Sequence, residues 1–361
     1  MDISKVEVRV VMKLRDWMKS LQIAAIYMGT IVGAGFATGQ EILQFFTRFG
    51  NWGTYAIIAA TFFFIWLGNK VMLLAHQIQA KSYEDLNIAL FGKKLGSLIS
   101  LFMLVVLLGV SAVMLAGAGT VFEENWNLPY QLGLIATCVI CFLLLRRGMH
   151  AIIAVNSIVV PIMLLFTLIM FFHTLKMPNT MSFMTIKTDF PLWTALSTPF
   201  LYTAFNLALA QAVLVPIGAQ TTNPAVIKYG SLLGGLGIGF MLGVGHIALS
   251  AHMPGIQQFS IPMGGIALNM SSIVYYIYIA IIFSEVFTTL LADIYGLALQ
   301  VHERSKLSTN LIIFIALICC YFLSQLGFGK LLATLYPLFG FISLGWFILI
   351  AKKRLSPLKK P

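Results

Sequence analysis

The chain has 361 residues, of which 59% are hydrophobic and 10% are charged, with a mean hydropathy of +0.92. Soluble domains carry about 25% charged residues, so this composition excludes a soluble protein and predicts an all-α integral membrane protein. The net charge of +11 raises nucleic-acid binding as an alternative, which the placement of the basic residues argues against.

Apolar stretches of membrane-spanning length follow one another along the chain. We expect about ten spans, at 21–49, 52–78, 95–122, 128–145, 149–172, 192–217, 228–251, 271–300, 307–326 and 331–351. The expected organisation is a cytoplasmic N-terminal arm (1–20), a first five-helix repeat (21–172), an external connection (173–191), a second five-helix repeat (192–351) and a cytoplasmic basic tail (352–361).

The basic residues gather on one side of this topology. Eighteen of the 23 Lys and Arg fall in connections on one side, and four fall on the other. Because Lys and Arg accumulate in cytoplasmic loops, the bias predicts a multi-pass cell-membrane protein with both termini in the cytoplasm. The expected partners are therefore the lipid bilayer and a small-molecule solute, with no nucleic acid and no protein partner predicted.

The first span is unusual for a membrane helix, since it carries glycines at 29, 33, 35 and 39, followed by Gln40 and Glu41. Glycine destabilises a helix interior by about 1 kcal/mol, and a glutamate at membrane depth costs at least ~3 kcal/mol. Unpaired backbone at that depth must be buried in protein or line a cavity. We therefore predict a discontinuous transporter helix, unwound at 33–36. Close packing of glycines at GxxxG spacing is the alternative.

The two halves of the chain have opposite orientations, because span one runs outward and span six runs inward. Span six is also irregular in its middle. Paired irregular spans in two inverted halves indicate a binding site near the midplane, so we predict that helices 1 and 6 are both discontinuous. The candidate substrate-binding residues are Gly33, Ala34, Gly35, Phe36, Tyr202, Phe205 and Asn206.

Span eight carries polar side chains on one face when its residues are placed about 100° apart. A polar face on a membrane helix must point into the protein. Hydroxyls beside the carbonyls of a broken first span suit Na⁺, whereas a carboxyl group could carry a proton. The candidate ion-coupling residues are Glu41, Glu285, Thr288 and Thr289, of which Thr288 and Thr289 are possible Na⁺ ligands. A structural hydrogen-bond network is the alternative.

Other polar groups favour structural interpretations. His246 is a lone histidine and is expected to be a satisfied interior group. Cys138 and Cys141 have CxxC spacing but lie within an apolar span, where a redox site is not expected. No enzyme motif is present, and no cofactor is expected apart from Na⁺ as a coupling ion. The segment 252–270 is too apolar for a free loop and is expected to fold over an external vestibule.

The sequence GTIVGAGFATGQE at 29–41 strongly resembles the first-span signature of the YkvI-type bacterial membrane proteins, regarded as amino acid permeases. More loosely, it resembles the GTxxGAG pattern of the amino acid–polyamine–cation superfamily. This resemblance implies the leucine-transporter-like fold, with spans one, two, six and seven as a moving bundle and spans three, four, eight and nine as a scaffold. It also implies that the substrate carboxylate meets Gly33 and Gly35, and that Thr288 and Thr289 match the hydroxyls of a sodium site.

Two departures from the superfamily bear on coupling. Span five lacks the lysine that replaces sodium in some proton-coupled relatives, which leaves Na⁺ open. Glu41 and Glu285 lie outside the superfamily pattern. We therefore expect a secondary active transporter of a small amino acid or related zwitterion, coupled to Na⁺ or H⁺. The alternatives are a cation or amine transporter, whose substrate Glu41 and Glu285 would neutralise, and a transporter-fold subunit that senses a metabolite.

Overall fold

The computed structural model describes residues 14–80, 82–146 and 149–353, except for the side chains of 149–160 and 303. Most of the predicted N-terminal arm and of the basic tail lies outside the described residues. The helices are α1 (Leu14–Ile31), α2 (Ala34–Ala37), α3 (Gln40–Phe45), α4 (Asn51–Ile78), α5 (Tyr83–Thr120), α6 (Tyr130–Leu145), α7 (Met149–Thr174), α8 (Ser182–Thr185), α9 (Leu192–Gln220), α10 (Pro224–Ala251), α11 (Pro262–Met270), α12 (Ser272–Ser305), α13 (Thr309–Ser324) and α14 (Phe328–Lys352). Three short turns complete them: η1 (Thr47–Phe49), the π-helical η2 (Val121–Asn125) and η3 (Gly255–Gln258).

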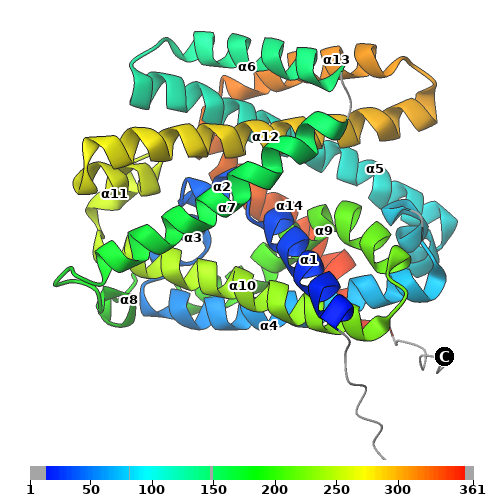
Figure 1. The fold of residues 1–361 in the computed structure, drawn as a ribbon, viewed down its shortest axis with the longest axis horizontal. Coiled ribbons are helices and arrows are strands. Elements are labelled where there is room, and N and C mark those ends of the chain that lie inside the picture. The colour runs from blue at the N-terminus through cyan, green and yellow to red at the C-terminus, as the bar shows by residue number, and fades with distance from the viewer. Residues whose placement is uncertain (1–13, 81, 147–148, 354–361) are drawn as a thin grey trace, which may run out of the picture.

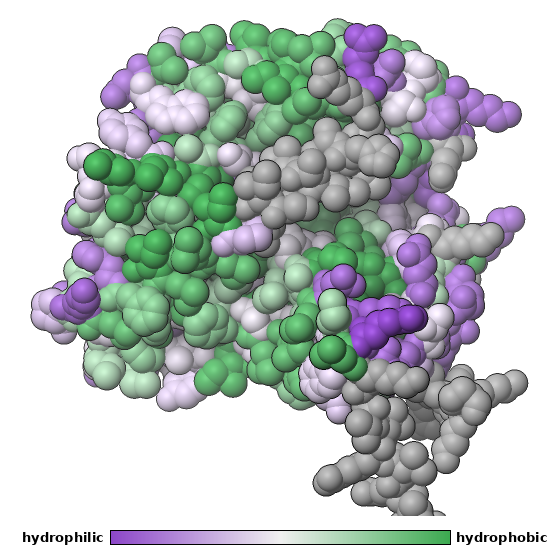
Figure 2. All heavy atoms as spheres, viewed as in Figure 1, coloured by the Kyte–Doolittle hydropathy of each residue, from purple (hydrophilic) through white to green (hydrophobic). Residues whose placement is uncertain are grey.

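Ten helical units follow the predicted spans in order, the first of them assembled from α1, α2 and α3. Among the described helices, six are long and apolar enough to cross a membrane: α4, α5 continued by η2, α9, α10, α12 and α14. The helices α6 and α13 and the described part of α7 are shorter apolar segments. Hydrophobic residues cover the middle of the face in Figure 2, and hydrophilic residues gather toward its left and right margins. The all-α membrane architecture is therefore confirmed.

The helices form two packed groups. The first consists of α1, α4, α9 and α10, and the second of α5, α6, α12 and α13 (Figure 1). In two five-helix repeats, α1 and α4 of the first half correspond to α9 and α10 of the second, and α5 and α6 correspond to α12 and α13. The contact of α1 with α10 then has its counterpart in the contact of α9 with α4, and the contact of α5 with α6 has its counterpart in that of α12 with α13. Such exchange symmetry is the signature of two inverted repeats. The groups correspond to the bundle and the scaffold that the family resemblance implied.

Span six differs from the prediction, because α9 is continuous from Leu192 to Gln220 and the expected break in helix 6 is wrong. Pro199 has no N–H, so it leaves the carbonyl of Ala195 without its helical donor. The hydroxyl of Thr198 donates to that carbonyl at 2.9 Å. This bond satisfies the group that the proline would otherwise leave unpaired, and the helix continues through the proline.

Candidate functional site

Helix one is interrupted twice, and the interruptions differ from the predicted unwinding at 33–36. The first lies at Val32 and Gly33, where Gly33 is extended (φ −111°, ψ −167°). The helical turn α2 follows, and a second interruption occurs at Thr38 and Gly39. Gly39 has φ 81°, a left-handed conformation that glycine adopts without steric cost. Because the intervening turn regains helical geometry, the unwound positions lie on either side of it.

At the second interruption, two released carbonyls are bonded to neighbouring elements. The hydroxyl of Tyr278 on α12 donates to the Ala37 carbonyl at 2.9 Å. The backbone N–H of Met263 on α11 donates to the Thr38 carbonyl at 3.0 Å. These bonds meet the requirement that irregular backbone at membrane depth be buried and satisfied by protein. The break is therefore held in place by α11 and α12.

Glu41 lies inside the break rather than beyond it. The turn at Gly39 brings the start of α3 back over α2, so that the Glu41 side chain packs against the Cα of Gly35. A Cβ added at Gly35 would meet the Cγ and Cδ atoms of Glu41 at 2.7 Å, and Oε1 is nearer still. The hydroxyl of Tyr202 on α9 donates to Glu41 Oε2 at 3.1 Å. The carboxylate is buried, with 4% of the residue exposed.

The polar face of α12 flanks the same break from another side. Thr289 Oγ1 lies 3.6 Å from the position that a Cβ on Gly33 would take. Thr288 and Thr289 donate their hydroxyls to the Glu285 carbonyl at 3.1 and 2.9 Å. Glu285 is buried, and its Oε2 has no hydrogen-bond partner among the described residues. Of the predicted α12 residues, Thr289 therefore lies beside the break, and Glu285 and Thr288 are buried on the same helix within one turn of it.

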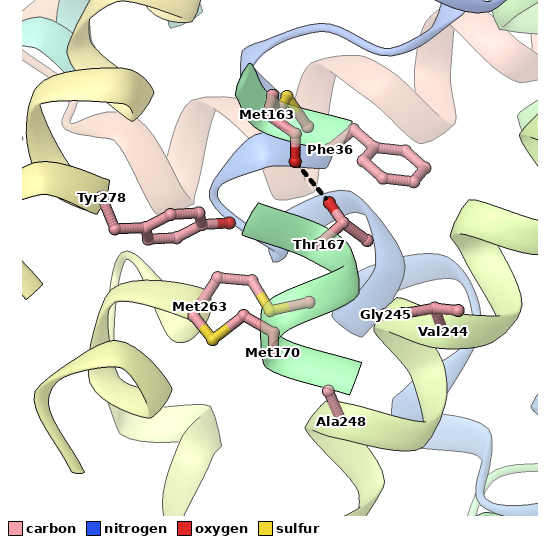
Figure 3. A pocket seen from close by; sticks show the side chains of 9 residues that line it. All are labelled: Phe36, Met163, Thr167, Met170, Val244, Gly245, Ala248, Met263 and Tyr278. Atoms are coloured by element: carbon pink, nitrogen blue, oxygen red, sulfur yellow. Dashed lines mark hydrogen bonds between the residues drawn. The ribbon is translucent and has the colours of Figure 1, made fainter. Parts of the chain in front are cut away.

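Three of the predicted substrate-binding residues have their side chains in other surroundings than Glu41 and Thr289. Phe36 enters a small apolar pocket between α2, α7, α10, α11 and α12, shown in Figure 3, together with Met163 and Met170. Phe205 packs against Tyr336 of α14, with ring centroids 4.5 Å apart. Asn206 donates its amide to the Tyr202 carbonyl at 3.0 Å. Of the predicted span-six residues, Tyr202 alone has a bond to the broken helix in the described structure.

The predicted external segment lies against the break. Its helix α11 contributes the Met263 N–H described above, and the Gln40 amide donates to the Phe259 carbonyl at 3.0 Å. A Cβ on Gly39 would meet Met263 Cγ at 2.8 Å. The segment therefore packs against the α2–α3 turn, while its cover over an external vestibule stays a prediction.

Sequence reasoning missed Tyr278, although a signal for it was present. It lies seven residues, or two helical turns, before Glu285 and so shares the polar face of α12. Met263 binds through its backbone, which its side chain could not reveal. Helix α14, which carries Tyr336, contacts α3, the helix of Glu41, and this proximity follows from tertiary packing alone.

His246 has the structural role expected of it. Its Nε2 lies 3.1 Å from Thr54 Oγ1, and its Nδ1 lies 3.0 Å from Thr47 Oγ1. Thr54 donates its own hydrogen to the Phe183 carbonyl at 3.0 Å, so it must accept from Nε2, and Nδ1 accepts from Thr47. The imidazole thus links α10 to α4, η1 and α8. Among the residues with described side chains, no group of three or more His, Cys, Asp or Glu could hold a metal ion.

The chain is similar in sequence to two relatives of one bacterium. No family model matches the chain. It is 39% identical over 334 residues to the uncharacterized membrane protein YkvI of Bacillus subtilis (strain 168), covering 92% of this chain and 95% of the relative. It is 26% identical over 331 residues to the uncharacterized protein YyaD of the same organism, covering 91% and 95%.

Solved structures share the fold at low sequence identity. Mhp1, a nucleobase-cation-symport-1 family transporter, in a closed conformation with bromovinylhydantoin bound, gives a TM-score of 0.65 at 14% identity, covering 93% of this chain and 79% of that one. A Na⁺-coupled sialic acid symporter gives 0.57 at 14% identity, covering 93% and 86%. The Eremococcus coleocola manganese transporter gives 0.56 at 14% identity, covering 95% and 81%. The fold is that of leucine-transporter-like membrane transporters, not that of an enzyme.

Proposed function

The chain belongs to the family of the Bacillus subtilis membrane protein YkvI, and on that premise we propose that it is a secondary active transporter of a small ammonium-bearing solute, working by alternating access. The observation that supports this proposal is the buried double break in helix one, which brings Glu41 onto Gly35. A helix that only anchors a protein gains nothing from such a break, whereas transporters use broken helices to expose groups that bind substrate and ions.

The ammonium group follows from the charge of the site. Glu41 is buried against Gly35 of α2. Glu285 is buried on α12, a helix that contacts α2. Burying an unpaired carboxylate is unfavourable, and an ammonium group on the solute would supply the missing partner. Amino acids and related zwitterions, the expected substrates, carry such a group, and so do simple amines.

For the coupling ion we place Na⁺ ahead of H⁺. The Thr289 hydroxyl lies next to the Gly33 backbone, and Thr288 is buried one residue before it. Hard cations are bound by hydroxyl, carbonyl and carboxylate oxygens, and this part of α12 offers all three. Glu285 as a proton carrier is the alternative.

The cellular location and orientation of the protein are proposed from the uneven distribution of Lys and Arg among its connections. We propose the cell membrane, with both termini in the cytoplasm, because eighteen of the 23 Lys and Arg lie on the side of the termini. Reporter fusions to residues 1 and 361 test this orientation, since a reporter active only outside the cytoplasm should stay silent at both ends.

The function is tested by uptake into proteoliposomes containing the purified protein. Labelled amino acids and amines are supplied under an imposed Na⁺ gradient or an imposed pH gradient, with protein-free liposomes as the control. Accumulation above equilibrium, abolished when an ionophore collapses the driving gradient, is the expected result. Flux that ignores both gradients contradicts coupling. Solute-induced thermal stabilisation without any flux would instead favour a sensor.

A further inference from the structure

We infer that Glu41 takes the position at which a substrate carboxylate would lie, so that the solute recognised is an amine that lacks a carboxylate. The family resemblance implied that a carboxylate of the substrate meets Gly33 and Gly35. In this chain a carboxylate already lies there, as part of the protein. The inference rests on the proposed transport function and narrows its substrate class.

The position of Glu41 is specific. Its Cγ, Cδ and Oε1 atoms occupy the space beside the Cα of Gly35, where a glycine alone leaves room for them. Tyr202 bonds to Oε2, so Oε1 remains turned toward Gly35. A second carboxylate approaching Gly35 would find the space beside its Cα already filled by the Glu41 carboxyl group.

Among the described residues, no basic side chain forms an ion pair with Glu41. The described residues contain one ion pair, between Arg304 and Glu84 on a different part of the surface. The nearest basic residue along the chain is Arg48, whose guanidinium stacks on Phe49 at 4.8 Å and on Phe190 at 5.2 Å. Thus the side chain bonded to Glu41 in the described structure, Tyr202, is neutral, and an ammonium group on the solute would be the cationic partner of Glu41.

The surroundings of Glu41 also suit an ammonium group. The Tyr202 ring packs against Phe45 and Phe46, with centroids 5.2 and 5.0 Å apart, and against Phe64 at 6.0 Å. Aromatic faces attract cations through their quadrupole, and sites for organic ammonium groups combine such rings with carboxylates.

Glu285 supplies an independent observation on the opposite flank. It is 2% exposed, and its Oε2 has no hydrogen-bond partner in the described structure. The helix that carries it contacts α2 directly. Each flank of the broken helix therefore carries a buried carboxyl group, Glu41 on one side and Glu285 on the other.

The test compares amines with the amino acids from which decarboxylation would form them. Phenethylamine with phenylalanine and isobutylamine with valine are measured by thermal-shift titration and by competition for uptake. We expect each amine to bind about tenfold more tightly than its amino acid, or better. Glu41→Gln should weaken amine binding by about tenfold or more and should not weaken amino acid binding. Glu84→Gln, which removes a surface charge, is the matched control and should change neither.

A second variant separates charge from folding. Tyr202→Phe keeps the Glu41 carboxylate but removes its hydrogen bond, so the preference for amines should persist. If phenylalanine and valine bind the natural protein more tightly than their amines, the inference is overturned while the transport function stands. If folded Glu41→Gln binds amines unchanged, the inference is likewise overturned. If neither class binds or is taken up, the proposed function fails as well.

Discussion

Glu41 and Gly35 are in direct contact across the break in helix one, because a Cβ at residue 35 would meet Glu41 Cγ and Cδ at 2.7 Å. The two residues lie six positions apart in the sequence. In a continuous helix they would be nearly two turns apart along the axis and would not touch. The left-handed turn at Gly39 brings them together. The glycine and the glutamate of the signature segment therefore form one structural unit.

The contact predicts strong coupling between these two positions. Gly35→Ala should lower stability by about 1–3 kcal/mol, because the added methyl overlaps a buried side chain. In a Glu41→Ala background the same change should have little effect, which a double-mutant cycle on thermal unfolding measures. Gly243→Ala is the matched control, since its Cβ would meet nothing within 4 Å. Additive effects of Gly35→Ala and Glu41→Ala would contradict the contact.

The turn between α2 and α3 predicts sensitivity at Gly39. Gly39→Ala should destabilise the protein by about 1–2 kcal/mol from the left-handed backbone alone, and further by overlap with Met263 Cγ. Met263→Ala removes the Cγ atom that a Cβ on residue 39 would meet, so Gly39→Ala in that background isolates the backbone contribution. The melting temperature should fall more for Gly39→Ala in the natural background than in the Met263→Ala background. Equal losses in the two backgrounds would show that α11 does not pack on this turn.

The sodium proposal predicts a specific defect in Thr289→Val. Valine keeps the shape of threonine but removes the oxygen beside Gly33. The Na⁺ concentration for half-maximal uptake should rise about tenfold or more, while the maximal rate at saturating Na⁺ should change little. Thr30→Val on α1, whose hydroxyl bonds within its own helix, is the control. Sodium dependence that is unchanged in Thr289→Val would remove this residue from the ion site.

Replacing His246 should lower the stability of the protein without changing how uptake depends on pH. His246→Ala leaves the buried Thr47 hydroxyl without its imidazole partner, whereas Thr54 keeps its bond to the Phe183 carbonyl. Leaving a buried polar group unsatisfied costs about 1–3 kcal/mol, so the melting temperature should fall. The pH dependence of uptake, relative to each variant's own maximum, should match that of the natural protein. A displaced pH profile would instead indicate a proton relay through this residue.

The sequence predicted what depends on local pattern. Span count, inverted halves and the interrupted first helix follow from hydropathy, charge bias and the glycines near Gly33. The shared face of Glu285 and Thr289 followed from helical periodicity. The predicted break in span six is wrong because the Thr198 hydroxyl replaces the donor that Pro199 lacks. The presence of a proline in the sequence does not reveal this side-chain hydrogen bond.

The position of Glu41 could not be read from the sequence. It depends on the φ of a single residue, Gly39, which decides whether α3 continues outward or turns back over α2. The orientation of Phe36 toward α7 and α10 depends in the same way on where the helical turn resumes. Both are consequences of tertiary packing against α11 and α12, which local pattern does not encode.

The central claim is that this site binds a solute and carries it with an ion. Its most direct test is uptake of labelled phenethylamine by proteoliposomes under an inward Na⁺ gradient, then under an inward proton gradient, with Glu41→Gln in parallel. We predict accumulation above the external concentration under one of the two gradients, lost in Glu41→Gln and lost when that gradient is collapsed. Equal levels inside and outside under both gradients, or full accumulation by Glu41→Gln, would contradict it.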